Sequence, residues 1–385
     1  MHTLRRNFLS TIMSLRLART PRHLGSRGLV ALGLFFTFAV ASFAAESADR
    51  VSAARVPAGL QPRKAQASAD GAIHVLCDSD SGPQYVKSRD GGRTFSTPIP
   101  VVDAASRKPG LKFLAWDFAV ARDGRVHVAL GTNAWQLKLP KEEWGFFYAA
   151  LAPGAAGFSP LRNLNHKPSE GFSIAAGERG AVVATFLSGK IFTMASRDGG
   201  VTFSEPAEPD ATLNPCKCCT TSVAYGTDGK LALLYREETD NERDVWLSLL
   251  DPAGTAKPAR TRISLTPWKI AACPMTYFTV VPAANGYIAA WPTKGQIYFA
   301  HLGKDGAVLP PGEIKTPGTN GMRTGVLALP AADGATLIAW KNSDALGWQL
   351  YDAKGQAQGN PGSAPSPGTG AAGVVLANGK FVLFP

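Results

Sequence analysis

Short apolar segments separated by glycine-containing turns recur along the chain from about residue 64 to its end. Each unit begins with an apolar strand, a tight turn and a second strand, and the turns are Asp70-Gly71, Asp123-Gly124, Arg179-Gly180, Asp228-Gly229, Asn285-Gly286, Asp333-Gly334 and Asn378-Gly379. Asp-Gly and Asn-Gly are typical of type I′ hairpins, because these residues accept the positive φ that such turns require. The pattern therefore predicts repeated copies of one β unit, 45 to 57 residues apart.

A third strand and a second turn follow in the first six units, so each unit reads as a four-stranded antiparallel meander. We therefore predict an all-β fold, a β-propeller of four-stranded blades. The seventh unit, residues 371–384, has sequence for two strands only. Because propellers usually close by pairing the two chain ends, residues 48–56 are expected to add a strand there. Seven blades are favoured, with six as the alternative.

Two of the second turns have nearly the same sequence, SRDGGRTF and SRDGGVTF. Their shared positions are Ser88, Asp90, Gly92, Thr94 and Phe95 in the first copy, and Ser196, Asp198, Gly200, Thr202 and Phe203 in the second. The aspartate is expected to accept backbone N–H groups across the turn, and the aromatic side chain to anchor the hairpin. Both are therefore interpreted as structural positions.

These turns resemble the Asp-box, or BNR repeat, of sialidase-type propellers. The resemblance covers residues 64–385 and implies the sialidase-like propeller fold. An Asp box marks a fold, so it does not by itself imply sialidase chemistry.

The net charge of +11 comes largely from the first 44 residues, which contain six arginines and no acidic residue. The rest of the chain has 34 basic and 29 acidic side chains, about +5. Nucleic-acid binding is not expected, since it requires a retained basic patch. Charged residues make up only 18% of the chain, alongside 40 glycines and 28 prolines, which suits many strands and tight turns.

Residues 1–44 are predicted to be a signal peptide. A basic segment, residues 16–27, precedes the apolar run LVALGLFFTFAV and the small-residue stretch ASFA. The apolar run is shorter than the roughly 20 residues that span a bilayer, so no stable membrane span is expected after cleavage. The domain prediction is a signal peptide at 1–44, an N-terminal segment with the closing strand at 45–63, and a propeller at 64–385. The mature protein is expected to be exported, periplasmic or extracellular, where disulfides can form.

Four of the five cysteines lie just before the first strands of two successive units: Cys216, Cys218 and Cys219 before the fourth, and Cys273, near Met275, before the fifth. First strands line the channel of a propeller, so the two segments are expected to meet at the channel mouth. Meander topology places them on the face opposite the two Asp-box turns. Cys77 ends a strand of the first unit and is interpreted as a small buried apolar residue.

Three interpretations of this cysteine cluster remain open. Disulfides between the adjacent segments are one, since the chain is expected to be exported. A soft-metal site is the second, because thiolates and a thioether favour copper as Cu(I), or zinc if four thiolates form a tetrahedron. A reactive thiol is the third.

Charged and aromatic residues are predicted on the same face and are candidate ligand-binding positions: Asp117, Glu170, Arg236, Glu237, Arg243, Tyr277 and Arg323. A sialidase needs arginines that hold a carboxylate, a tyrosine nucleophile with a glutamate, and an acid/base aspartate. The F/Y-R-I-P arginine motif of that family is absent, and Gln61-Pro62-Arg63-Lys64 stands in its place. The charged run at 236–244 is also typical of a solvated, ion-paired loop. The catalytic residues, if there are any, are unknown.

The cysteine run, together with Tyr235-Arg236-Glu237 and Trp268-Lys269-Ile270, is similar to a group of exported bacterial sialidase-like proteins with a C-x-C-C motif, often named exo-α-sialidase on the repeat alone. The leading hypothesis is an exported propeller that binds a ligand or a soft metal at its cysteine-rich channel face. The alternatives are an exo-α-sialidase-type glycoside hydrolase and a non-catalytic assembly scaffold. The expected partners are accordingly a small molecule, a glycan, a metal ion or another protein.

Overall fold

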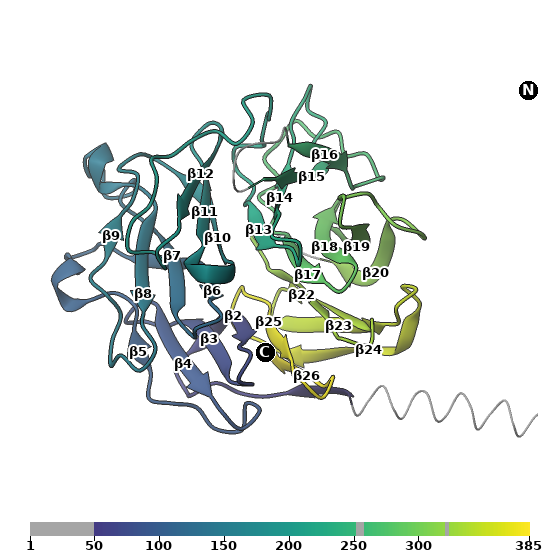
Figure 1. Cartoon of the computed structure of the whole chain (residues 1–385), viewed down its shortest axis with the longest axis horizontal. Helices are drawn as coiled ribbons and strands as arrows, with labels where there is room; N and C mark the ends of the chain where they lie inside the picture. The colour runs from purple at the N-terminus through teal and green to yellow at the C-terminus, as the bar shows by residue number, and fades with distance from the viewer. Residues whose placement is uncertain (1–49, 252–257, 320–322) are drawn as a thin grey trace, which may run out of the picture. The chain divides into compact units, whose positions relative to one another are not determined.

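A computed structural model describes residues 50–251, 258–319 and 323–385. The predicted signal peptide therefore lies outside the described residues. The described chain folds into seven sheets arranged around a ring (Figure 1), which confirms the all-β propeller with seven blades. The first strands of successive sheets pack side by side around the centre, in the order β2, β6, β10, β13, β17, β21, β25 and back to β2.

Blades 1, 2 and 3 follow one another in the chain. Blade 1 has β2 (Gln61–Ala67), β3 (Ile73–Asp78), β4 (Gln84–Ser88) and β5 (Ile99–Pro100). Blade 2 has β6 (Phe113–Val120), β7 (Val126–Thr132), β8 (Phe147–Leu151) and β9 (Arg162–Asn163). Blade 3 has β10 (Glu170–Ala176), β11 (Val182–Leu187) and β12 (Ile191–Ser196). Three short 3-10 helices lie between these strands: η1 (Ala104–Ser106), η2 (Lys141–Glu143) and η3 (Glu178–Gly180).

Blades 4, 5 and 6 are four-stranded, and blade 7 joins the two ends of the described chain. Blade 4 has β13 (Ser222–Tyr225), β14 (Leu231–Arg236), β15 (Val245–Leu250) and β16 (Ala259–Arg262). Blade 5 has β17 (Thr279–Ala283), β18 (Gly286–Thr293), β19 (Gln296–Gly303) and β20 (Ile314–Thr319). Blade 6 has β21 (Val326–Pro330), β22 (Thr336–Asn342), β23 (Ala345–Tyr351) and β24 (Ala357–Pro365). Blade 7 has β25 (Ala372–Val375), β26 (Phe381–Phe384) and β1 (Val51–Ala53).

Blades 3 and 7 differ from the simple repeat. The outer strand of blade 3 is reduced to a single antiparallel bridge between Thr193 and Ala207. Pro206 and Pro209 flank this bridge, and proline cannot donate to a sheet, so the pairing extends no further. In blade 7, β1 pairs in parallel with β26, Val51 opposite Phe381 and Ala53 opposite Leu383. The strand expected within residues 48–56 is therefore present as β1, beside the last strand of the chain.

The core consists of apolar layers between adjacent blades. Leu76 and Tyr85 of blade 1, for example, pack with Phe118 and Val128 of blade 2. The largest layer lies around blade 5, where Trp291 and Phe299 are fully buried. Packing of this kind fixes each blade against its neighbours. None of the helices within the described residues is long and apolar enough to cross a membrane.

The two near-identical turns have the same hydrogen bonds. Asp90 Oδ1 accepts the N–H of Arg93 at 3.0 Å and of Thr94 at 2.9 Å, and Ser88 Oγ donates to the same carboxylate at 2.8 Å. In the second copy Asp198 accepts Thr202 N at 2.9 Å and Thr202 Oγ1 at 2.6 Å. These hydrogen bonds stabilise the ionised carboxylate and hold its pKa well below the ordinary value.

Exchanging Asp198 for alanine is expected to lower the melting temperature at pH 7 by a few degrees, because the turn N–H groups lose their acceptor. A carboxyl whose pKa is depressed by folding stabilises the protein above its unfolded pKa of about 4, and this stabilisation is lost as the pH falls further. The melting difference should therefore narrow at low pH. Thermal unfolding at pH 7 and pH 3 measures this, with the exposed Asp80 replaced by alanine as the control. Equal effects of the two substitutions would contradict the structural role.

Candidate functional site

Backbone hydrogen bonds bring the two cysteine segments together at the inner side of blades 4 and 5. Cys216 N donates to Arg236 O at 2.8 Å, which ties the first segment to the end of β14. Thr220 N donates to Thr276 O at 3.4 Å and joins this segment to the one that enters β17. These backbone hydrogen bonds hold the entries of β13 and β17 together independently of any contact between sulfur atoms.

The sulfur atoms of four cysteines form one cluster. Cys216 Sγ lies 3.4 Å from Cys218 Sγ and 3.6 Å from Cys219 Sγ. The sulfurs of these three residues all lie within 4.8 Å of one another. Cys218 is joined to Cys273 by a disulfide, with a Cα–Cα distance of 6.2 Å. Cys216 and Cys219 are buried free thiols. We refer to Cys216, Cys218, Cys219 and Cys273 as the sulfur cluster.

The sulfur cluster and the Asp198 turn lie at opposite ends of the strands of blade 3. Thr221 N donates to Gly171 O, near the first residue of β10. Gly199 N, within the Asp198 turn, donates to Gly180 O, beyond the last residue of β10. Because Thr221 lies two residues after Cys219, the cluster lies at the β10 entry end, away from the turn.

Cys77 is not part of the cluster. It lies fully buried in β3, in an apolar layer with Val75, Val86 and Val382. Burial raises the pKa of its thiol to about 12. It therefore has the small apolar role expected from the sequence.

A fully buried arginine lies beside the sulfur cluster. Arg236, the last residue of β14, is 1% exposed. Its guanidinium donates to Arg243 O at 2.5 Å, Pro292 O at 2.6 Å and Thr276 Oγ1 at 3.2 Å. Its Cζ also lies 5.0 Å from the centre of the Trp268 ring. Arg236 therefore lies in the protein interior, and the solvated position that its charged loop suggested is wrong.

The sulfurs and the basic groups influence each other's ionisation. Arg243 Nη1 donates to Cys216 Sγ at 3.0 Å. Burial raises the pKa of Cys219, but its hydrogen bonds with Cys216 and Thr276 and the charge of Arg236 outweigh burial and lower the pKa below its ordinary value. The hydrogen bond with Cys219 and burial raise the pKa of Cys216 far above its ordinary value. Burial lowers the pKa of Arg236, and the charges of Cys219 and Cys216 counteract this shift. The site thus favours one thiolate, at Cys219, next to a buried guanidinium.

The spacing of three sulfurs, those of Cys216, Cys218 and Cys219, resembles the spacing in a tetrahedral soft-metal site. A zinc ion with bonds of about 2.3 Å to four sulfurs places those sulfurs about 3.8 Å apart. The separations of Cys216 Sγ from Cys218 Sγ and Cys219 Sγ, 3.4 and 3.6 Å, are close to this value. Thiolates are the ligands that Cu(I) and Zn(II) prefer. In the disulfide form, Cys218 and Cys273 no longer offer thiolates.

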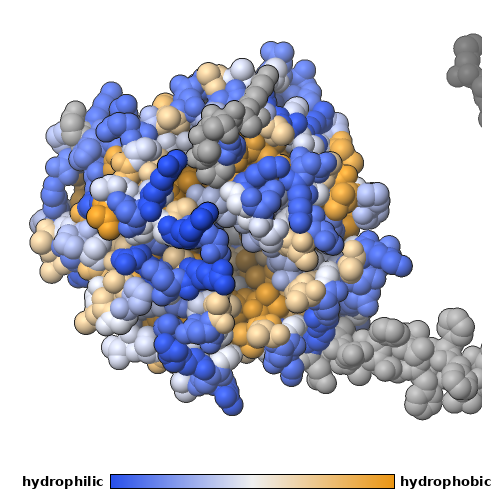
Figure 2. All heavy atoms as spheres, viewed as in Figure 1, coloured by the Kyte–Doolittle hydropathy of each residue, from blue (hydrophilic) through white to orange (hydrophobic). Residues whose placement is uncertain are grey.

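A small cavity at the centre of the ring lies next to the cluster. It has a volume of about 90 Å³ and is lined by residues from all seven blades, among them Lys64, Asp117, Phe172, Thr220, Tyr277 and Thr369. Thr220 directly follows Cys219, so the cluster adjoins this channel mouth. The face that carries the β10–β11 hairpin, which Figure 2 shows, is also hollowed near the centre of the ring, with apolar residues in the hollow.

Asp117 is a cross-blade tie within the channel mouth. It is 5% exposed and pairs with Lys64 of blade 1. Its other oxygen accepts Ile174 N of blade 3 at 3.0 Å. One carboxylate thus connects the inner strands β2, β6 and β10.

Replacing Asp117 by alanine is therefore expected to lower the free energy of unfolding by about 2–4 kcal/mol, since it leaves Ile174 N and Lys64 without their acceptor. Urea unfolding at pH 7 measures this. Glu178, an exposed acidic residue that pairs with Arg122, is a suitable control, and its alanine variant should cost at most about 1 kcal/mol. Similar losses for both variants would contradict the tie.

The remaining predicted site residues have different partners. The Tyr277 ring lies 6.0 Å from that of Trp116, whereas Glu237 pairs with Arg260 on the outer strand β16 at 2.8 Å. Tyr277 and Glu237, the tyrosine and one of the glutamates among the candidate ligand-binding residues, thus have separate contacts, and these contacts do not join them as a nucleophile and base.

Glu170 and Arg323 lie on the channel side. Burial raises the pKa of Glu170, and the charge of Arg323 opposes the shift. Arg323 N donates to Met275 O at 2.9 Å. This hydrogen bond ties the segment that contains Met275 to the chain just before β21.

Sequence reasoning missed two residues of this region. Thr276 has its hydroxyl 3.5 Å from Cys219 Sγ and accepts from Arg236, so it joins the sulfur and the cation. The only feature of the sequence that pointed to Thr276 was its position directly after Met275. Lys64 was noted only for its place in a mismatched motif, and its partner Asp117 is 53 residues away.

Comparisons with known proteins support the fold only. No family model matches the chain, and no curated protein matches it. One solved structure, titled as the crystal structure of a mitotic checkpoint complex, contains a chain similar to this one with a TM-score of 0.52 at 12% identity, over 96% of this chain and 94% of that chain.

Sialidases are also among the structural neighbours. A leech intramolecular trans-sialidase aligns with a TM-score of 0.45 and 10% identity, over 80% of this chain and 68% of that one. The intramolecular trans-sialidase of Ruminococcus gnavus aligns with a TM-score of 0.45 and 10% identity, over 84% and 88%. These values show a likeness of fold and carry no chemistry.

Proposed function

We propose that this protein is an exported propeller that binds one soft metal ion, Cu(I) or Zn(II), through Cys216, Cys218, Cys219 and Cys273 in their reduced form. The signal peptide predicted at 1–44 from the sequence supports export, and the two repeated turns are proposed to be Asp boxes of the sialidase type. The metal assignment depends on the sulfur cluster and its surroundings, as follows.

The observation that carries the proposal is the buried guanidinium of Arg236 beside the cluster. Its hydrogen-bond acceptors are two backbone carbonyls and one hydroxyl, which are neutral groups. A buried cation is costly unless a negative charge compensates it. The groups whose negative charge counteracts the burial of Arg236 are the Cys219 and Cys216 sulfurs and the buried carboxylate of Asp244. This environment favours a thiolate at Cys219.

A bound metal ion explains why four sulfurs lie together better than a cluster of four thiolates without a metal does. Four thiolates carry −4, and a Zn(II) ion reduces this to −2. Arg236 and Arg243, both adjacent to the cluster, supply +2. If the ion is Cu(I) bound by fewer thiolates, Arg236 and Arg243 compensate the remaining negative charge in the same way. A metal ion thus removes the repulsion that a bare thiolate cluster would have.

A glycan ligand has less support. A cavity of about 90 Å³ at the channel mouth is small beside the roughly 300–1,000 Å³ of ordinary small-molecule sites. Both terminal nitrogens of Arg236, and Nε and Nη1 of Arg243, already donate to backbone oxygens or to Cys216. The sialidase and scaffold alternatives remain outcomes of the test.

The test is the metal content of protein purified under reducing conditions, combined with a count of reactive thiols after unfolding. The chain has five cysteines. We expect about one equivalent of copper or zinc per chain and five reactive thiols. Two results together would reject the proposal in favour of a structural disulfide. The first is a count of three reactive thiols in protein that has not been reduced, and the second is that no metal stays bound after the protein is reduced and reloaded with metal. Turnover of a sialoside by metal-free protein would support the hydrolase instead.

A further inference from the structure

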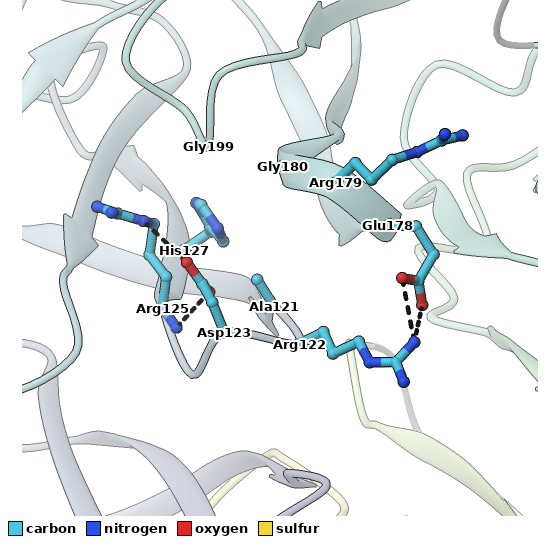
Figure 3. Close-up of a pocket in the computed structure, with 10 residues that line it drawn as sticks. Ala121, Arg122, Asp123, Arg125, His127, Glu178, Arg179, Gly180 and Gly199 are labelled. Atoms are coloured by element: carbon cyan, nitrogen blue, oxygen red, sulfur yellow. Dashed lines mark hydrogen bonds and ion pairs between the residues drawn. The ribbon is translucent and has the colours of Figure 1, made fainter.

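A second cavity lies far along the strands from the sulfur cluster, at the hairpin end of blades 2 and 3. It has a volume of about 330 Å³. Its walls come from the β6–β7 hairpin, the β10–β11 hairpin and the Asp198 turn (Figure 3), and include Ala121, Arg122, Arg125, His127, Glu178 and Gly199. We call it the hairpin pocket. None of its residues belongs to the proposed metal site.

Two buried polar atoms line the hairpin pocket without a hydrogen-bond partner among the described residues. They are Nε2 of His127 and Nε of Arg125. His127 is fully buried, and its Nδ1 is engaged with the hydroxyl of Tyr148 at 2.7 Å. Buried donors and acceptors are normally satisfied, because leaving one unpaired costs free energy. These two atoms therefore call for a partner in the pocket.

Blade 1 contains the same histidine–tyrosine pair, and there Nε2 of the histidine has a hydrogen-bond partner. His74 Nδ1 is 2.7 Å from the Tyr85 hydroxyl, and His74 Nε2 is 3.0 Å from Ser68 Oγ. Ser68 and Ala121 are equivalent positions: Ser68 N donates to Ala72 O and Gly71 N to Ser68 O, just as Ala121 N donates to Arg125 O and Gly124 N to Ala121 O. The repeat has a serine in blade 1 and an alanine in blade 2, and that difference removes the partner of His127.

Blade 1 also indicates which nitrogen carries the proton. Ser68 Oγ donates to Asp70 Oδ1 or Ala72 O, so its oxygen accepts from His74 Nε2–H, and Nδ1 accepts from the tyrosine hydroxyl. By the same geometry His127 presents Nε2–H. Burial and the charge of Arg125 lower the pKa of His127 to about 4, so the ring is neutral and has a single N–H at neutral pH. The pocket thus presents two N–H donors.

The charged side chains that line the pocket sum to +1, and two of the three arginines are in ion pairs. Arg122 pairs with Glu178 at 3.1 Å, and Arg179 extends away from His127 (Figure 3). Arg125 Nε lies 3.9 Å from Asp123 Oδ2, an ion pair that leaves this N–H without a hydrogen bond. The lining has three arginines and two carboxylates. Gly199 keeps the space open, because a Cβ there would lie 3.5 Å from Arg125 Nε.

We propose that the hairpin pocket binds a small oxyanion, a phosphate or a carboxylate, whose oxygens accept from His127 Nε2 and Arg125 Nε. Replacing Ala121 with serine is the sharpest test, since it introduces the hydroxyl that blade 1 already has. That hydroxyl takes the hydrogen bond of His127 and occupies the place of the ligand oxygen. The substitution is small and copies a geometry that this protein already accommodates, so the fold is expected to be retained.

The experiment is titration of the full protein with inorganic phosphate and, separately, with acetate, in a buffer free of other oxyanions. Calorimetry gives the affinity, and the side-chain NMR signals of His127 report where the ion binds. We expect Ala121→Ser and Arg125→Gln each to lower the affinity at least about tenfold, as loss of one charge-assisted hydrogen bond implies. Ser68→Ala, the reverse change at the equivalent place in blade 1, should leave it unchanged.

The two anions separate the possible sources of the ligand. Binding of phosphate alone assigns the pocket to phosphoryl compounds, and binding of acetate as well assigns it to carboxylates. Failure of both anions to bind at millimolar concentration would overturn the proposal and leave water as the partner of His127. Equal affinities of wild type and Ala121→Ser would also overturn it.

Discussion

Exchanging Cys218 for serine is expected to lower the affinity of the reduced protein for Zn(II) or Cu(I) by on the order of 100-fold or more. Removing a group that only orients a metal ligand already costs about 10–100-fold, and Cys218 is proposed to be a ligand itself. A serine hydroxyl is hard and rarely ionised, so it replaces a thiolate poorly. Competition with a chromophoric chelator under reducing conditions measures the affinity.

Cys77 supplies the matched control, because it is a buried cysteine in blade 1, outside the sulfur cluster. Its replacement by alanine should leave the metal affinity unchanged. If Cys218→Ser and Cys77→Ala bind metal equally well, the four sulfurs do not form the site. Circular dichroism of both variants excludes unfolding as the cause of a loss.

Replacing Arg236 with methionine should have the largest effect on stability. We expect the free energy of unfolding to fall by about 3–5 kcal/mol, the usual cost of removing one member of a buried charge pair. The variant leaves the Arg243 and Pro292 carbonyls without their donor and the cluster without its buried cation. Metal affinity should also fall, by roughly 10–100-fold, because Arg236 acts next to the ligands.

Urea unfolding measures the stability change, with Arg89→Met as the control. Arg89 pairs with Asp70 on the surface, and its side chain is 71% exposed, so its loss should cost at most about 1 kcal/mol. An Arg236 variant as stable as the Arg89 variant would mean that the buried guanidinium has no counter-charge to lose. The electrostatic argument for thiolates would then fail.

The blade number and the meeting of the two cysteine segments were accessible from the sequence for a physical reason. Hairpin turns such as Asp123-Gly124 recur in register, and the meander topology then determines which strand entries are neighbours. Cys219 and Thr276, 57 residues apart, are in contact because β13 and β17 are adjacent inner strands. Local turn chemistry was enough to predict this.

The burial of Arg236 was not accessible in the same way. Its surroundings in the sequence are charged, and nothing local distinguishes a solvated arginine from a buried one. Its acceptor Pro292 lies 56 residues away in the next blade, and Asp117 likewise meets Ile174 at a distance of 57 residues. Such partners depend on side-chain directions across blade interfaces, which a repeat pattern does not contain.

The parallel pairing of β1 with β26 constrains how a growing chain reaches this structure. β1 is made before any other described strand, yet its first residue, Val51, pairs with Phe381 near the end of the chain. Until β26 is made, β25 lacks its neighbour and the gap between β21 and β2 stays open, with apolar layers around Leu327 and Val75 uncovered. Contacts this distant form slowly. Nascent chains that end before Phe381 should therefore depend on chaperones, and capture of the final strand should be the step that releases them.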